Sequence, residues 1–106
     1  MATLSTHVLD TGAGRPATGV TVVLESAAGE VLKVARTDAD GRIGSLGEEL
    51  APGVYRLRFD TGAWFAEAGV EAFYPEVAVA FTIAADDHFH VPLLLSRYGY
   101  STYRGS

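Results

Sequence analysis

The 106-residue chain has no cysteine. It therefore contains no disulfide framework, no thiol nucleophile and no cysteine-based zinc site, and this agrees with the reducing cytoplasm, the location we expect. Positive charge is also scarce, because eight basic residues against thirteen acidic residues leave a net charge of −5. We expect no nucleic-acid partner, since phosphate binding needs a basic face. A small anionic ligand remains compatible, because one pocket can be cationic in an acidic molecule.

The sequence also lacks any apolar run near the ~18 residues that a membrane helix needs. Residues 1–5 have neither the basic start nor the apolar core of a signal peptide, so we expect no leader and no membrane partner. No repeat, low-complexity segment or linker interrupts the chain. Its length suits one domain and its 48% of hydrophobic residues can form one core, so we predict a single domain over residues 1–106.

Apolar and polar residues alternate in short segments, which is typical of half-buried strands. The clearest apolar rows are Val20, Val22 and Leu24; Tyr55, Leu57 and Phe59; and Val77, Val79, Phe81 and Ile83. The first of these rows belongs to a strand near residues 20–26, and further strands are expected near residues 4–10, 30–37, 87–96 and 99–104. The pattern as a whole predicts an all-β sandwich of eight short strands in two packed sheets.

Turn-forming residues separate these strands, and one segment breaks the alternation. Turns are expected at 28–29, 38–41 and 51–53, and a loop at 12–16. Residues 61–69 predict a short helix of about two turns, with Thr61 as the N-cap and Gly69 as the stop.

The segment Asp87–Ser96 carries two of the three histidines. Its alternation predicts a core face of Phe89, Val91, Leu93 and Leu95, and an opposite face of His88, His90, Pro92 and Leu94. With His7 in the first strand, all three histidines can lie on one sheet. The following segment, Tyr98–Ser106, holds three tyrosines and an arginine. Taken alone, these features also suit surface histidines and an edge strand with aromatic cross-strand pairs.

Six segments together resemble a known family. They are His88–Ser96 (HFHVPLLLS), Tyr100–Ser106 (YSTYRGS), Ser5–Asp10 (STHVLD), Gly14–Ala17 (GRPA), Thr37–Arg42 (TDADGR) and Phe73–Val77 (FYPEV). In this order they are similar to the 5-hydroxyisourate hydrolases of the transthyretin-related family, over essentially the whole chain. The closing Tyr-Arg-Gly-Ser is the most specific part, because the hormone-carrying transthyretins lack it. Arg97 departs from the family, which usually has proline there, and we expect a looser turn.

The resemblance implies a transthyretin-like sandwich of eight strands in two sheets with one short helix. It also implies hydrolysis of 5-hydroxyisourate, the product of urate oxidation, to 2-oxo-4-hydroxy-4-carboxy-5-ureidoimidazoline in purine degradation. This reaction opens a cyclic amide. It needs an activated water, a stabilised oxyanion and groups that hold a flat polar ring.

Residue by residue, the family's catalytic groups fall on His7, Arg42 and His90. The two imidazoles would activate water and transfer protons, and the sequence leaves open which one is the base. Arg42 would direct its planar donors to the ring carbonyl oxygens and the oxyanion. The role of His88 also stays open, between support for the site and plain exposure.

The resemblance gives the tail a role as well. Tyr103, Arg104 and Gly105 would hold the substrate ring, and Ser106 would orient a histidine or the water through its hydroxyl or a terminal carboxylate. The family forms homotetramers with sites in a channel between dimers, and it uses no metal or cofactor. A mixed polar and apolar face with His7 and His90 suits burial in such an assembly.

Three other functions compete with this interpretation. A zinc enzyme would use His7, His88 and His90 as three imidazole ligands, although no carboxylate has a matching spacing. A calcium loop at Asp38–Gly41 is rejected, because Arg42, a cation, stands at its fifth position, where a calcium loop has an oxygen ligand. A non-catalytic carrier of small ligands is the main alternative, and a purely adhesive sandwich domain would need none of these side chains.

Overall fold

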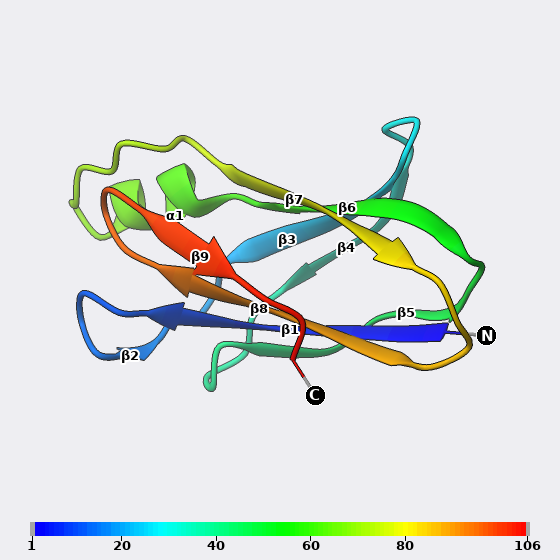
Figure 1. Ribbon diagram of the computed structural model, residues 1–106. Helices are drawn as coiled ribbons and strands as arrows, with labels where there is room; N and C mark the ends of the chain where they lie inside the picture. The colour runs from blue at the N-terminus through cyan, green and yellow to red at the C-terminus, as the bar shows by residue number, and fades with distance from the viewer. Residues whose placement is uncertain (1, 106) are drawn as a thin grey trace.

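The alternating segments form two β-sheets that pack face to face (Figure 1). The structure is a computed structural model that describes residues 2–105. Its elements are β1 (Ala2–Asp10), β2 (Arg15–Pro16), β3 (Thr21–Ser26), β4 (Val31–Arg36), β5 (Arg42–Leu50), β6 (Gly53–Phe59), α1 (Thr61–Glu67), β7 (Val77–Ile83), β8 (His88–Leu95) and β9 (Tyr100–Thr102). The prediction of a mostly β, two-sheet fold with one short helix is confirmed.

The first sheet is built around β1. Its partner on one side is β8, which runs parallel to it and carries β9 on its far edge. On the other side, β5 pairs with β1 as far as His7, and β2 pairs with Leu9 and Asp10. The second sheet has the order β4-β3-β6-β7 and is antiparallel throughout. The outward side chains of β1 therefore lie between those of β5 and β8.

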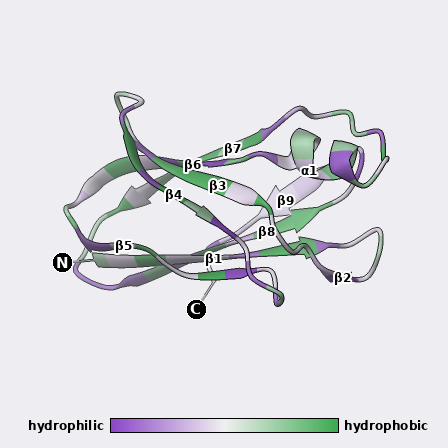
Figure 2. Cartoon of the chain, turned by 180° about the vertical axis from the view of Figure 1, so that it is seen from behind, coloured by the Kyte–Doolittle hydropathy of each residue, from purple (hydrophilic) through white to green (hydrophobic). Residues whose placement is uncertain are grey.

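The core fills the space between the sheets, and hydrophobic residues follow strands of both (Figure 2). The predicted inward faces are confirmed for Val20, Val22 and Leu24 on β3 or just before it, and for Phe89, Val91, Leu93 and Leu95 on β8. Val79 and Phe81 are only partly buried against this core. Full burial of one such side chain stabilises the fold by roughly 1.5–3 kcal/mol, so the core fixes which face of β8 is outside.

The predicted N-cap of the helix is wrong. α1 begins at Thr61, but the N-cap position belongs to Asp60, and no side chain caps it. Thr61 is buried within the first turn, and its hydroxyl has no hydrogen-bond partner in residues 2–105. Gly69 has a φ of 70° just after the helix, as the predicted stop requires. No helix of the described residues is long and apolar enough to cross a membrane.

Two strand boundaries also differ from the prediction. The expected loop at 12–16 contains the two-residue strand β2, because Arg15 and Pro16 close back onto the end of β1. This makes nine strands within residues 2–105 instead of eight. The last strand ends at Thr102, and only an isolated bridge between Gly105 and His90 continues it. The turn before it is closed by hydrogen bonds between Ser96 and Gly99.

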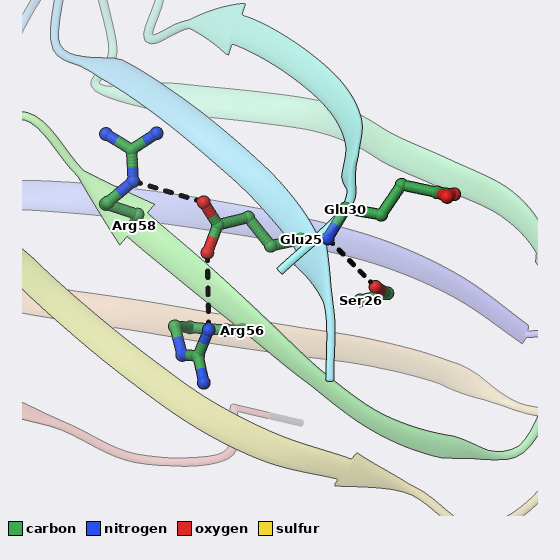
Figure 3. A network of polar contacts seen from close by, with 5 residues as sticks. All are labelled: Glu25, Ser26, Glu30, Arg56 and Arg58. Carbon is green, nitrogen blue, oxygen red and sulfur yellow. Dashed lines mark hydrogen bonds and ion pairs between the residues drawn. The ribbon is translucent and has the colours of Figure 1, made fainter. Parts of the chain in front are cut away.

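The outer faces of the two sheets differ in character. On the second sheet, Glu25 lies between Arg56 and Arg58, with N–O distances of 3.4 and 3.3 Å (Figure 3). Ser26 caps the neighbouring hairpin by accepting a bond from the Glu30 amide. These ion pairs are part-buried, because the two arginine side chains are 39% and 33% exposed and the Glu25 side chain is 13% exposed. The histidines all lie on the other sheet.

Candidate active site

Three neighbouring strands bring His7, Arg42 and His90 to one face. His7 on β1 is paired directly with Arg42 on β5, and Ser5, two residues before His7, is paired with His90 on β8. Because side chains alternate along a strand, these four point to the outer face of the first sheet. An open pocket of about 310 Å³ lies there, lined by Ser5, Thr6, Arg42, Ile43, Gly44, His88 and His90.

The turn before β5 holds Arg42 in place. The Asp38 carboxylate accepts bonds from the amides of Asp40 and Arg42, at 2.9 and 3.0 Å. The Arg42 amide is the main cause of the lowered pKa of Asp38. Gly41 has a φ of 74°, and a Cβ there would lie 2.4 Å from the Val8 carbonyl oxygen. The turn therefore needs glycine at position 41. The Arg42 guanidinium itself has no hydrogen-bonding partner within residues 2–105.

The tautomer of His7 follows from its partner. Its Nε2 lies 2.8 Å from the carbonyl oxygen of Asp40, at the tip of the same turn. A carbonyl oxygen only accepts hydrogen bonds, so Nε2 must donate. Neutral His7 therefore has its free lone pair on Nδ1.

His88, whose role the sequence left open, belongs to a chain of polar contacts. Thr3 Oγ1 lies 2.6 Å from His88 Nδ1, and His88 Nε2 lies 2.9 Å from Ser5 Oγ. Ser5 Oγ also lies 2.8 Å from His90 Nδ1. Thr3 and Ser5 were not predicted as site residues. The available signal was the alternation on β1, which puts them on the same face as His7.

His90 is suited to remain neutral. Burial lowers its pKa below the ordinary value, and the nearby positive charges of Arg42, His7 and His88 lower it further. Its Nε2 has no hydrogen-bond partner within residues 2–105. A neutral imidazole that carries its proton on the hydrogen-bonded nitrogen can accept a proton from water at the other nitrogen.

The tail reaches the site through Gly105. The Gly105 amide donates to the His90 carbonyl oxygen at 2.8 Å, and a Cβ on Gly105 would lie 2.6 Å from His90 Cδ2. In Figure 1 the chain after β9 turns across β8 toward the outer side of the first sheet. Gly105 therefore packs directly against the His90 ring.

The other tail residues lie farther from this pocket in the single chain. Arg104 stacks on the Phe89 ring, 4.4 Å from its centroid, and lies 3.6 Å from the Asp87 carboxylate. Tyr103 is 57% exposed and lines a separate groove of about 290 Å³ beside β7. Ser106 lies outside the described residues.

The arrangement can support hydrolysis by side chains. Two imidazoles offer lone pairs beside an unpaired guanidinium, which can stabilise a developing oxyanion. Within residues 2–105, no group of three or more His, Asp or Glu residues has the geometry to hold a metal ion. The three histidines instead contact Ser5, Thr3 and the Asp40 carbonyl.

Comparisons with known proteins agree with the fold and with the predicted family. A 5-hydroxyisourate hydrolase of Salmonella dublin is 50% identical to the chain, covering 97% of the chain and 80% of that protein. The structure of Klebsiella pneumoniae 5-hydroxyisourate hydrolase is similar with a TM-score of 0.93 and 48% identity, covering 100% of this chain and 94% of that one. Sea bream transthyretin in complex with thyroxine is 32% identical, with a TM-score of 0.88 over 96% of this chain and 93% of that one.

The family model described as the HIUase/Transthyretin family matches residues 4–105, nearly the whole chain. Together with the identities above, this confirms the resemblance of the six segments. The chain belongs to the HIUase/Transthyretin family.

Proposed function

We propose that this chain hydrolyses 5-hydroxyisourate to 2-oxo-4-hydroxy-4-carboxy-5-ureidoimidazoline, a step of urate degradation. The observation that carries the proposal is the gathering of His7, Arg42 and His90 on one face of the first sheet, where Arg42 and His90 line an open pocket. Relatives of 42–50% identity from bacteria and yeast, and a mouse relative of 45%, bear the name of this activity. The cysteine-free composition supports the cytoplasm as the place of action.

In the proposed reaction, His90 is the base. Its open Nε2 takes a proton from a water molecule as the water oxygen bonds to the carbonyl carbon of the cyclic amide. The carbonyl oxygen becomes an oxyanion, which Arg42 stabilises with its unpaired donors. The carbon–nitrogen bond of the cyclic amide then breaks, and the ring nitrogen receives a proton from the imidazolium. The former carbonyl carbon becomes the carbon of the new carboxyl group. His7 adds a second imidazole beside the water.

The tail completes the pocket in this proposal. Gly105 contacts the His90 ring. Tyr103 and Arg104 lie between the end of β9 and Gly105, and Arg104 stacks on Phe89 of β8. Tyr103 faces a groove of its own in the single chain, so its contact with substrate depends on how chains assemble. Ser106 is proposed to orient the water or a histidine.

The assembly is proposed to be a homotetramer. Large aromatic side chains are exposed around β9, the free edge of the first sheet: Phe73, Tyr74, Tyr98, Tyr100 and Tyr103. An exposed apolar patch of this kind typically marks an interaction surface. The patch on the edge strand of the first sheet therefore supports assembly of several copies.

A carrier is the second candidate. The sea bream transthyretin was solved in complex with thyroxine, so the fold also holds small ligands. A carrier needs a pocket but no proton-transfer groups. The open Nε2 of His90 beside Arg42 therefore favours hydrolysis.

The proposal is tested with the His90→Asn variant, which keeps a polar side chain but removes the titratable imidazole. Loss of general base catalysis predicts a fall in kcat on the order of 10²-fold or more. Decay of fresh 5-hydroxyisourate is followed by its ultraviolet absorbance. Glu25→Gln, on the outer face of the other sheet, is the matched control and should retain full activity. Full activity in folded His90→Asn would overturn the assignment.

A further inference from the structure

Ser5 connects the two histidines of β8. Its hydroxyl lies between His88 Nε2 at 2.9 Å and His90 Nδ1 at 2.8 Å, and Ser5 is only 8% exposed. The parallel pairing of β1 with β8 creates this arrangement, because it puts Ser5 directly opposite His90. His88 continues the chain to Thr3 at 2.6 Å and is itself exposed.

A hydroxyl has one proton, so two arrangements use the Ser5 proton within the chain of contacts when both histidines are neutral. In the first, Ser5 donates to His90 Nδ1, and His90 must carry its proton on Nε2. In the second, His90 Nδ1 donates to Ser5, Ser5 donates to His88 Nε2, and His88 Nδ1 donates to Thr3. Only the second leaves the lone pair of His90 on Nε2.

We propose that Ser5 is a positioning residue that holds the proton of His90 on Nδ1 and links it through His88 to solvent. The proposal rests on the proposed function, in which Nε2 of His90 is the base. Ser5 and His88 then act through His90.

The same contacts give the proton a path. When Nε2 takes a proton from water, the Nδ1 proton can move to Ser5 Oγ while the Ser5 proton moves to His88 Nε2. Each group gains one proton as it gives one: His88 passes its Nδ1 proton to Thr3 Oγ1, and Thr3 releases its own proton to solvent. The reverse sequence returns a proton for the leaving nitrogen. The other groups facing His90 are Arg42 on β5, His7 on β1 and the Gly105 backbone; the Arg42 guanidinium does not accept a proton at working pH.

The experiment measures the tautomer of His90 directly, by NMR of the protein labelled with ¹⁵N-histidine at about pH 8, above the ordinary histidine pKa of ~6.5. We expect the Nδ1–H form of His90 in the wild type and a mixture of both tautomers in Ser5→Ala. We expect kcat to fall roughly 10- to 100-fold, the usual scale for losing a group that orients a catalytic or ligating histidine, with KM nearly unchanged. Ser5→Thr keeps the hydroxyl and should restore both the tautomer and kcat.

His88→Phe provides an independent arm, because His88 is exposed and its replacement leaves the core untouched. It should weaken the preference of His90 for Nδ1–H and lower kcat. Ser26→Ala, which removes a hydroxyl from the other sheet, should change neither.

Two results would overturn the proposal. One is an Nε2–H tautomer of His90 in the wild type, and the other is a tautomer that neither Ser5→Ala nor His88→Phe alters. A purely structural role for Ser5 would lower the melting temperature but leave the tautomer as it is. If the tautomer changes while kcat does not, the contact is real but His90 is not the base; the proposed role of His90 and this inference then fail, while the proposed hydrolysis stands.

Discussion

Gly105→Ala is the sharpest perturbation that the site allows, because it adds one methyl group against the His90 ring. The new Cβ would lie 2.6 Å from His90 Cδ2 and 3.3 Å from Cγ. Carbon atoms in contact sit ~3.5–4.0 Å apart, so the ring and the tail must separate by roughly 1 Å. Gly105 is not among the glycines with positive φ, so the backbone itself accepts alanine. The effect should come from the displaced imidazole alone.

A misplacement of about 1 Å can cost on the order of 10²-fold in rate, and we expect a loss of that size in kcat. Stability should change little, because Gly105 adds one bridge at the end of the chain. The assay is the decay of 5-hydroxyisourate, with circular dichroism and light scattering to verify fold and assembly. Gly12→Ala is the control, since its Cβ would make an ordinary 3.5 Å contact with Asp10. Wild-type kcat in Gly105→Ala would refute the packing of the tail against His90 as a requirement for catalysis.

The other predictions concern the tail, metal and pH. A chain ending at Thr102 should stay folded by circular dichroism, because its core residues lie elsewhere, yet lose nearly all hydrolysis; retained turnover would exclude the tail from the site. Dialysis against a chelator should leave the rate unchanged, and a loss restored by zinc would instead favour the three-histidine metal site. The kcat/KM should fall as pH drops through the pKa of His90, because only neutral imidazole is a base. Burial and the charges of Arg42, His7 and His88 lower that pKa, so the inflection of the pH profile should lie below ~6.5. In Arg42→Gln, which removes one positive charge, the inflection should move to higher pH, and a shift the other way would contradict the assignment.

Local patterns in the sequence predicted the layers of the fold well. Alternation in segments such as Val20–Leu24 and residues 87–96 depends only on which face is buried, so both inward rows were identified. Details that depend on three-dimensional geometry were harder to predict from the sequence. The N-cap is Asp60 instead of Thr61, because the helix begins one residue earlier than its hydroxyl pattern suggests. The strand β2 depends on Arg15 returning to Asp10, which no local pattern encodes.

The candidate site, too, could be predicted only in part from the sequence. His7, Arg42 and His90 were singled out by resemblance, and the register of three strands brings them to one face. Ser5 was not singled out, because its importance arises from a parallel pairing between residues 85 positions apart. The contact of Gly105 with His90 is equally long-range in origin. Neither contact leaves a periodic signal in the chain.

Turnover of 5-hydroxyisourate by the wild-type protein can be measured directly. Substrate is generated fresh and supplied in large excess over the protein, and its decay is compared with that in buffer alone. We expect accelerated decay with many substrate molecules consumed per subunit, and a rate proportional to protein concentration. Decay no faster than in buffer, or an effect that saturates at one substrate per subunit as for a carrier, would contradict the proposed function.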